Sequence, residues 1–271
     1  MNLSLNSFVK ETLKRFDVGI TSYRNLQQLV KSRNELIELQ EKSRIDMALL
    51  LELPNRHLSQ LLRSLPGSRS QLRQDLFVLS ELDFKRNGFF VEFGATNGVD
   101  LSNTYLLEKE FGWKGILAEP AKRWHSELKS NRNNSIETDC VWRESNSVLT
   151  FNEVDKAELS TIDEYSSSDL HRENRKDGRT YDVKTISLED LLDKHHAPRK
   201  IDYLSIDTEG SEYEILSSFN FDRYQFKIIT CEHNFTSARE EIFSLLAKNN
   251  YVRKYESLSH FDDWYVRSEQ V

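Results

Sequence analysis

The sequence predicts an α/β domain with a mostly parallel sheet, preceded by a helical N-terminal segment. From Gly88 onward, short apolar runs alternate with helix-like stretches, the pattern of parallel strands joined by helical crossovers. Near the C-terminus, two strand-like runs are separated by only a few residues, so they must pair antiparallel. We therefore expect a seven-stranded, mostly parallel sheet that ends in an antiparallel hairpin.

The first 66 residues differ from the rest because they show no strand-like alternation. Apolar residues recur there at helical spacing, namely Leu26, Leu29, Val30, Leu36 and Ile37. A second helical run is expected over Ile45–Leu53. Pro66-Gly67 is the clearest break in the chain, since both residues interrupt regular structure. We place the boundary there, with a helical segment over 1–66 and the α/β domain over 67–271.

The role of the helical segment is open between two readings. It either forms a homodimer or a lid through its helices, or packs as a cap on its own domain. The seven-residue spacings Leu29–Leu36 and Val30–Ile37 cover only two heptads, too few to identify a coiled coil.

The elements of the α/β domain follow in order along the chain. The expected core strands are Gly88–Gly94, Lys114–Pro120, Ser135–Trp142, Lys200–Asp207, Phe226–Asn234, Tyr251–Glu256 and Asp263–Arg267. The expected helices are Leu101–Phe111, Ala121–Ser130, Ser187–Lys194, Gly210–Phe219 and Ser237–Lys248. Ser147–Val154 and Asp182–Ile186 are expected to be additional strands. Because loops and insertions shape acceptor pockets, we expect residues 143–182 to contribute to one.

Composition limits the partners. The chain of 271 residues has a net charge of −7, and its Lys and Arg residues are scattered, so we expect no nucleic-acid partner. An uncharged or cationic small substrate fits this balance better. The N-terminus lacks the apolar run of a secretory signal, and no stretch reaches the roughly 20 apolar residues of a membrane span. With only two distant cysteines, we expect a soluble, cytoplasmic protein.

The strongest local signal is the segment Val91–Gly98, in which Gly94, Ala95 and Gly98 follow an apolar strand. Ligands of such sheets bind beyond the carboxyl ends of the strands, where glycine lets them approach the backbone. Glu92 either accepts hydrogen bonds from a ligand ammonium or orients the loop. The dinucleotide pattern G-x-G-x-x-G is not met, and a tight turn without a ligand is the alternative reading.

Two further signals suit a nucleoside. Glu119 ends the second strand, where an acidic residue can hold a ribose diol with its two oxygens. The alternative reading is that Glu119 is a solvated charge at a strand end and binds no ligand. Near the end of the third strand, Asp139 can accept from an adenine amino group, while the backbone amide near Cys140 meets a ring nitrogen. We expect the Cys140 sulfur itself to be a small buried hydrophobe.

Polar residues at the ends of two later strands are candidates for catalysis. Asp207 follows the strand that begins at Lys200, and Glu232, His233 and Asn234 end the next one. Either His233 or Asp207 is expected to act as the base. Asp207, Glu232 and Asn234 also offer the hard oxygen ligands that Mg²⁺ prefers, so a metal is a second possibility.

From about Ser70 to Val271 the chain resembles the FkbM family of S-adenosylmethionine-dependent methyltransferases. The resemblance rests on SQLRQD (Ser70–Asp75), GFFVEFGATNGVDLSNT (Gly88–Thr104), LEKEFGWKGILAEP (Leu107–Pro120), IDYLSIDTEGSEYEIL (Ile201–Leu216) and CEHN (Cys231–Asn234). It implies a Rossmann-like class I methyltransferase fold and O-methylation of a small molecule or sugar.

The resemblance also implies roles for individual residues. The methionine part of the cofactor would lie against Glu92, Gly94, Ala95, Gly98, Ser102 and Asn103. Glu119 would take the ribose, and Asp139 with Cys140 the adenine. Asp207 would lie near the transferred methyl group. Two alternatives to O-methylation stay open: N-methylation of a small amine, and a scaffold protein that binds the cofactor without catalysis.

Overall fold

The computed structural model describes residues 23–167 and 172–268. Its contacts divide the chain into two units, Met1–Met47 and Ala48–Val271, which are described separately here. Residues 1–22 of the predicted helical segment lie outside the described residues. The predicted boundary after residue 66 stays a prediction.

One helix, α2 (Tyr23–Glu52), replaces the two helical runs predicted before Pro54. The prediction of a separate second run was wrong, because no glycine or proline lies between them to break the helix. The helix ends just before Pro54, whose ring cannot continue it. Among the described residues, no helix is long and apolar enough to cross a membrane.

The second unit begins with helical elements that share its core. Leu49, Leu53 and Leu61 are fully or almost fully buried, and Leu61 lies in α3 (Leu58–Ser64). The buried His57 ring bonds through Nδ1 to Ser80 Oγ at 3.0 Å, which ties this region to the helix α4 (Gln74–Glu81).

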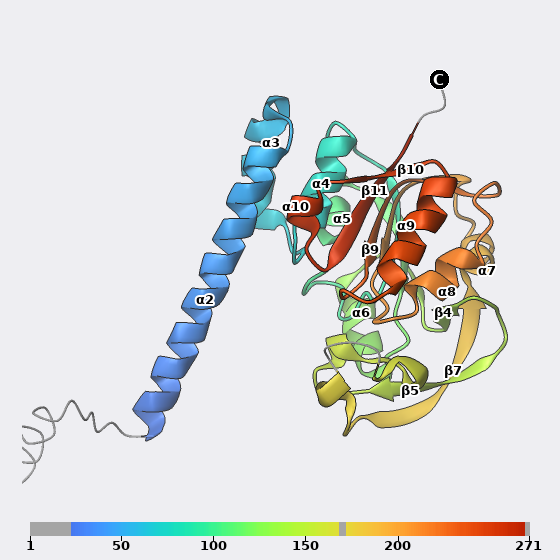
Figure 1. The fold of residues 1–271 in the computed structure, drawn as a ribbon, viewed down its shortest axis with the longest axis horizontal. Coiled ribbons are helices and arrows are strands. Elements are labelled where there is room, and N and C mark those ends of the chain that lie inside the picture. The colour runs from blue at the N-terminus through green and yellow to red at the C-terminus, as the bar shows by residue number, and fades with distance from the viewer. Residues whose placement is uncertain (1–22, 168–171, 269–271) are drawn as a thin grey trace, which may run out of the picture. The chain divides into compact units, whose positions relative to one another are not determined.

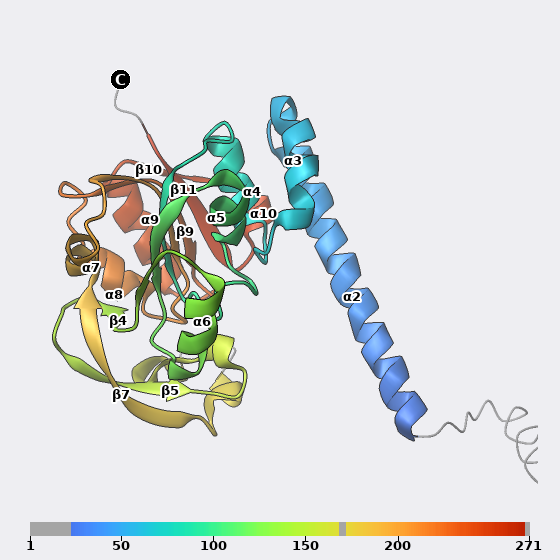
Figure 2. The ribbon, with the colours of Figure 1, turned by 180° about the vertical axis from the view of Figure 1, so that it is seen from behind.

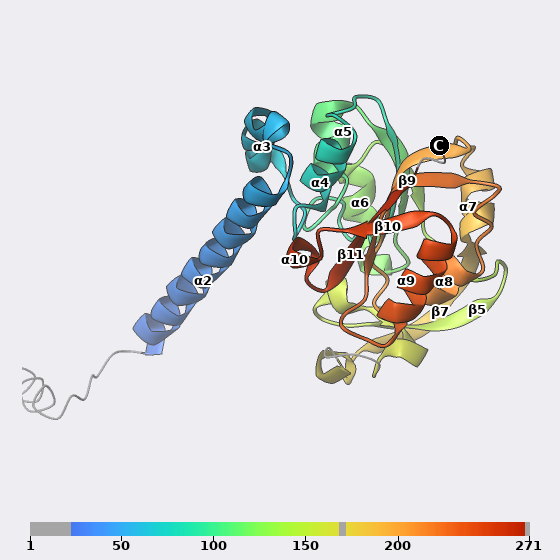
Figure 3. The same cartoon turned by 45° about the horizontal axis from the view of Figure 1, so that its top comes forward.

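The main sheet has seven strands in the order β10-β11-β9-β8-β1-β2-β3. Their bounds are β1 Phe89–Phe93, β2 Lys114–Ala118, β3 Ser135–Glu137, β8 Lys200–Ile206, β9 Gln225–Glu232, β10 Tyr251–Lys254 and β11 Asp262–Arg267. The strands β3, β2, β1, β8 and β9 are parallel. The strand β11 is antiparallel to both of its neighbours, β9 and β10 (Figure 3). This confirms the predicted sheet and its hairpin, although a one-turn helix α10 (Glu256–Ser259) lies within the predicted hairpin loop.

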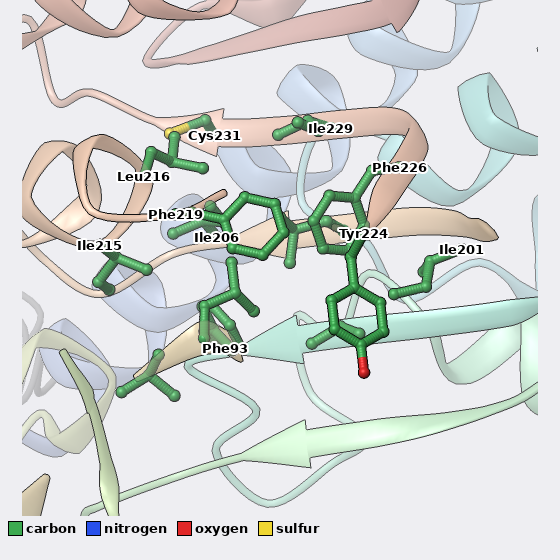
Figure 4. Packing of buried hydrophobic residues seen from close by; sticks show 14 of the residues in the cluster. Phe93, Ile201, Ile206, Ile215, Leu216, Phe219, Tyr224, Phe226, Ile229 and Cys231 are labelled. Carbon is green, nitrogen blue, oxygen red and sulfur yellow. The ribbon is translucent and has the colours of Figure 1, made fainter. Parts of the chain in front are cut away.

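Helices cover both faces of this sheet (Figures 1 and 2). One face carries α7 (Leu188–Lys194), α8 (Glu212–Ser217) and α9 (Ala238–Lys248), and the other carries α4, α5 (Tyr105–Phe111) and α6 (His125–Asn131). The face of α7 to α9 packs on a continuous apolar core that includes Ile206, Ile215 and Phe226 (Figure 4). Burial of these side chains on a layered α/β framework is the main stabilising contribution to such a domain.

The predicted strand Ser135–Trp142 is two strands in different sheets, so this prediction was wrong. Glu137 ends β3, and its Oε1 accepts hydrogen bonds from the amides of Thr138 and Asp139 at 2.9 and 3.1 Å. These local bonds replace ladder bonds, and the chain turns away from the main sheet. It continues as β4 (Cys140–Trp142), which pairs with β7 (Arg179–Ser187).

The second sheet has four strands in the order β4-β7-β5-β6. The predicted additional strand Ser147–Val154 is β5 (Val148–Glu153), and the predicted strand Asp182–Ile186 lies within β7. The short strand β6 (Thr161–Ile162) was not predicted. The sheet packs through the buried side chains of Trp142, Phe151 and Val183. It lies at one end of the domain, next to α6 (Figure 2).

Candidate active site

A cavity lies at the edge where the carboxyl ends of the parallel strands meet. Gly94 follows β1, Glu119 follows β2, Asp207 follows β8 and Glu232 ends β9, and all four line the cavity. This edge is where ligands bind in open α/β sheets. The topology therefore brings together residues that are far apart in the sequence.

Gly94 allows the first strand to turn tightly against the neighbouring loop. Its φ is +70°, and a Cβ at this position would lie 2.1 Å from the carbonyl oxygen of Asp207. Gly98 also has a positive φ, +78°, and its Cβ would lie 2.6 Å from Cγ of Arg132. Side chains are excluded at both positions, so the turn needs glycine for two reasons, conformation and space.

Glu92 is hydrogen-bonded by the loop that follows it. Its carboxylate accepts hydrogen bonds from the Asn103 amide at 2.6 Å, from the Ser102 hydroxyl at 3.0 Å and from the Thr104 hydroxyl. Burial is the main reason why the pKa of Glu92 is raised. Of the two roles predicted for Glu92, these bonds support orientation of the loop.

Arg132 completes this arrangement and was missed by sequence reasoning. The guanidinium is buried, lies 3.7 Å from the Glu92 carboxylate and pairs with Glu108. Its Nη1 also donates to the carbonyl oxygen of Gly98 at 3.0 Å. A single arginine in a polar stretch carries no pattern that would have singled it out.

Glu119 faces the glycine turn from the end of β2. Oε2 accepts a hydrogen bond from the Thr96 amide and Oε1 one from the Ala121 amide, both at 2.8 Å. Burial raises the pKa of Glu119 to about 7. Each carboxylate oxygen has a second lone pair, so the group can still accept bonds from a ligand that enters the cavity.

The two residues predicted for adenine differ in position. Cys140 is buried and lines the cavity, and burial raises the pKa of its thiol to about 12, which agrees with an unreactive small side chain. Asp139 is not among the lining residues, and its amide donates to Glu137. Ala95, Gly98 and Ser102 likewise support the loop without lining the cavity.

Asp207 and Glu232 form a coupled pair on the other side of the cavity. Burial raises the pKa of Asp207 to about 7 and that of Glu232 well above its usual range, and each carboxyl influences the other. One oxygen each from Asp207, Glu209 and Glu232 lies within 4.8 Å of the other two. Asn234, predicted as a ligand of the same group, donates Nδ2 to Glu209 at 3.2 Å.

His233 does not line the cavity. Its ring is buried, Nδ1 accepts a hydrogen bond from the Phe235 amide at 3.0 Å, and Nε2 lies 3.8 Å from Asp263. Burial lowers the pKa of the ring. The sequence placed His233 at a strand end correctly, but side chains alternate along a strand, and this one is oriented away from the cavity.

The segment between β4 and β7 closes part of the cavity, whereas the contribution of residues 143–182 to an acceptor pocket stays a prediction. Phe151, Ser160 and Ile162 contribute to its lining. The buried Arg175 links this segment to the site, because it donates to Glu209 at 2.7 Å and to the carbonyl of Leu159 at 2.7 Å. Residues 168–171 of the segment lie outside the described residues.

The cavity is strongly acidic: among the described residues that line it, none is Lys, Arg or His. Five of its acidic residues accept hydrogen bonds from donors of the protein, namely Glu92, Asp100, Glu119, Glu209 and Asp262. Three others complete the acidic lining: Glu158, Asp207 and Glu232.

A seven-stranded sheet with this order, direction and glycine turn defines a Rossmann-like class I methyltransferase fold. A sequence model of the family described as "Methyltransferase FkbM domain" matches residues 92–255, more than half of the chain. The chain therefore belongs to the FkbM methyltransferase family and is an S-adenosylmethionine-dependent methyltransferase, as the resemblance predicted. None of the curated proteins matches it in sequence.

Three solved structures with a similar fold are distant in sequence. A precorrin-6y C5,15-methyltransferase from Geobacter metallireducens is 10% identical, with a TM-score of 0.38, over 71% of this chain and 85% of that one. A TehB-like SAM-dependent methyltransferase from Corynebacterium glutamicum is 7% identical, with a TM-score of 0.37, over 79% and 97%. The CurJ carbon methyltransferase is 10% identical, with a TM-score of 0.38, over 89% and 71%.

Proposed function

We propose that the protein is an O-methyltransferase that acts on a hydroxyl group of a small molecule or sugar. The observation that carries the proposal is that Glu119 and Asp207 line one cavity from the ends of β2 and β8. The first suits a ribose and the second suits a reacting hydroxyl. A cytoplasmic location and a homodimer through the N-terminal helices stay predictions.

The residues at the glycine turn suit S-adenosylmethionine. The turn at Gly94 leaves space for close approach to the backbone, and the buried Asn103 Oδ1 lines the same cavity and lacks a protein partner among the described residues. An oxygen in that state suits a ligand that donates hydrogen bonds. When bound, S-adenosylmethionine supplies an electrophilic methyl group on a sulfonium.

We assign the parts of the cofactor as follows. Glu119 would accept the ribose hydroxyls, and the backbone near Cys140, with Asp139, would contact the adenine. Asn103 and the turn from Gly94 would contact the methionine part. Glu92, Ala95, Gly98 and Ser102 would fix the shape of the turn.

Asp207 is the proposed proton acceptor. A carboxyl with a pKa of about 7 is partly ionised near neutral pH and can take a proton from a positioned hydroxyl. Since Glu232 is coupled to it, the proton belongs to the pair rather than to either residue. His233 remains the second candidate, although its contacts lie away from the cavity.

A magnesium ion is not part of the proposal. In the cluster of Asp207, Glu209 and Glu232, Glu209 already accepts hydrogen bonds from Arg175 and Asn234, so only two of the three carboxyls would be left for a metal. The Asp207–Glu232 pair can remove the proton of an acceptor hydroxyl without a metal ion. N-methylation stays the second candidate function, favoured by the absence of basic residues among the described residues of the cavity lining.

The test compares Asp207→Asn with His233→Gln, using methyl transfer to a panel of hydroxyl and amine acceptors. We expect Asp207→Asn to lower kcat by about a hundredfold or more, the usual contribution of a general base, and to leave S-adenosylhomocysteine affinity nearly unchanged. For the wild type, kcat/KM should fall as pH drops below about 7, because Asp207 then binds a proton. If His233→Gln abolishes turnover while Asp207→Asn does not, the assignment of the base is wrong. If the protein methylates only the amine acceptors of the panel, the proposed function is N-methylation and not O-methylation.

A further inference from the structure

Two carboxylates at the far side of the cavity face each other across neighbouring strands. Glu232 on β9 and Asp262 on β11 are direct partners in the antiparallel register. Both are buried, with exposed fractions of 7% and 4%, and both line the cavity. Burial raises the pKa of both carboxyls well above the usual range, and a cation bound between them would favour their ionised forms.

Each of these carboxylates has one oxygen without a protein partner among the described residues, Oε2 of Glu232 and Oδ1 of Asp262. The other oxygen of Asp262 accepts from Nε2 of Gln74 at 3.0 Å and from the Trp264 indole at 3.3 Å. Buried acceptors are almost always hydrogen-bonded in native proteins, so these two exceptions on neighbouring strands, besides Oδ1 of Asn103 in the same cavity, point to a ligand that donates hydrogen bonds.

The neighbouring residue Asp263 shows how this protein treats a buried carboxylate that is structural. Asp263 receives two hydrogen bonds from Arg239, both at 2.9 Å, and a third from Arg253 at 3.2 Å. Within the described ranges no such cation reaches Asp262, although the two residues are adjacent in the same strand. The difference is in what each side chain faces: Asp262 faces the cavity.

The position of the pair assigns it to the acceptor rather than to the cofactor. In the sheet order, β9 is two strands from β1 and β11 is three strands from it. With about 4.8 Å between neighbouring strands, Glu232 and Asp262 lie roughly 10–14 Å from the strand that carries the glycine turn. Asp207, the proposed proton acceptor, follows β8, between the two regions.

We propose that Glu232 and Asp262 form a subsite for a positively charged amine of the methyl acceptor, which is therefore a hydroxyl compound that also carries an ammonium group. An ammonium offers three donors for the two unpartnered oxygens, and its positive charge would favour ionisation of the two carboxyls. The hydroxyl group of the acceptor rests on the proposed O-methylation. The ammonium subsite concerns binding only and can be tested without methyl transfer. Acceptors that carry an amine should bind more tightly than those that carry a carboxylate or phosphate, since the lining among the described residues is acidic and has no cation.

The test uses two sets of matched compounds that differ only in charge. Glucosamine, glucose and glucuronate form one set; tyramine, 4-ethylphenol and 4-hydroxyphenylacetate form the other. Binding to protein saturated with S-adenosylhomocysteine is measured by calorimetry and by ligand-detected NMR. We expect the amine of at least one set to bind about tenfold more tightly than its neutral and acidic counterparts, and less tightly as salt rises.

Variants connect this preference to the two residues. Glu232→Gln and Asp262→Asn should each weaken amine binding by about tenfold while the affinity for S-adenosylhomocysteine stays within about threefold. Glu127→Gln, an exposed carboxylate on α6 outside the cavity, is the matched control and should change neither. Because Glu232→Gln also changes the pair with Asp207, Asp262→Asn alone is sufficient if Glu232→Gln does not fold.

The outcomes separate the subsite from the proposed reaction. Equal or tighter binding of neutral or acidic compounds, or no binding by either amine, overturns the subsite. So does a loss of S-adenosylhomocysteine affinity in Asp262→Asn, or Mg²⁺ or Mn²⁺ binding that depends on Glu232 without any amine binding. If an amine binds as expected but neither it nor other hydroxyl compounds are methylated, O-methylation fails and the subsite stands.

Discussion

Gly94 carries the most specific constraint in the site at the scale of single residues. Its φ is positive, and a Cβ there would lie only 2.1 Å from the Asp207 carbonyl oxygen, so any side chain would be both strained and obstructed. The turn joins the proposed cofactor region to the proposed proton acceptor through this one contact. A substitution here should therefore affect binding more than a glycine replacement elsewhere.

We expect Gly94→Ala to weaken S-adenosylhomocysteine binding by about a hundredfold and to destabilise the protein by about 1–3 kcal/mol. The control is Gly112→Ala, because Gly112 also has a positive φ, +69°, but a Cβ there meets only the Asn87 side chain. The control should lose stability and keep its affinity. Calorimetric titration and thermal unfolding measure the two effects, and normal binding by Gly94→Ala would contradict the role of this turn.

Residue types at strand ends were predictable, but side-chain directions were not. Sequence spacing placed Gly94, Glu119 and Asp207 at the strand ends, where the structure also has them. His233 could not be assigned in the same way, because a shift of one residue along a strand moves the side chain to the other face. Asp262 and Arg175 were missed because their importance depends on contacts with distant parts of the chain.

At the scale of elements, the loop between β1 and α5 depends on buried charge. Arg132, which precedes β3, binds the loop carbonyl of Gly98 and pairs with Glu108, while Glu92 holds the loop amides. The predicted start of the helix at Leu101 was too early, since α5 begins at Tyr105 and Leu101 has a φ of +60°. Local propensity predicts a helix from Leu101. Ser102 and Asn103 instead donate hydrogen bonds to Glu92, and this holds the segment before Tyr105 in a loop.

Arg132→Met should lower the free energy of unfolding by about 3–5 kcal/mol, since it removes the cation beside the buried Glu92 and leaves the half-buried Glu108 with its pair to Lys109 as the remaining ion pair. The exposed pair of Arg143 and Glu214 provides a comparison. Arg143→Met should cost less than about 1 kcal/mol, as is usual for surface pairs. Denaturant unfolding of both variants gives the comparison, and equal losses would show that burial of Arg132 carries no special contribution.

At the scale of the whole molecule, the sheet order was predictable and the second sheet was not. Alternation of apolar runs and helical stretches defines parallel crossovers, and a short final connection defines an antiparallel end. The break after Glu137 depends on a side chain bonding to its own backbone, which apolar patterning does not reveal. As a result, β4 was predicted as the end of a main-sheet strand, and β7 was predicted only in part, as the additional strand Asp182–Ile186.

The second unit also starts earlier than the predicted boundary suggests. A chain that begins at Ala48 should keep the unfolding free energy of its α/β domain. A chain that begins at Gln71 should lose about 5 kcal/mol or more, because it lacks the buried side chains of Leu49, Leu53 and Leu61. Denaturant unfolding of the two chains measures this difference, and equal stability would restore a boundary near residue 66.

Light scattering on the same chains decides the role of the N-terminal helix. A homodimer through this helix predicts twice the protomer mass for the full chain and a single protomer mass for the chain from Ala48. If the full chain and the chain from Ala48 both have the mass of one protomer, the predicted homodimer is wrong.

The cofactor site is central to the proposed activity. Calorimetric titration with S-adenosylhomocysteine tests this site most directly. We predict binding on the order of micromolar Kd by the wild type, and a loss of about tenfold or more, about 1.4 kcal/mol, for Glu119→Ala. Glu127→Gln serves as the control and should bind like the wild type. A folded wild-type protein without detectable binding, or a Glu119→Ala variant with unchanged affinity, would contradict the site described here.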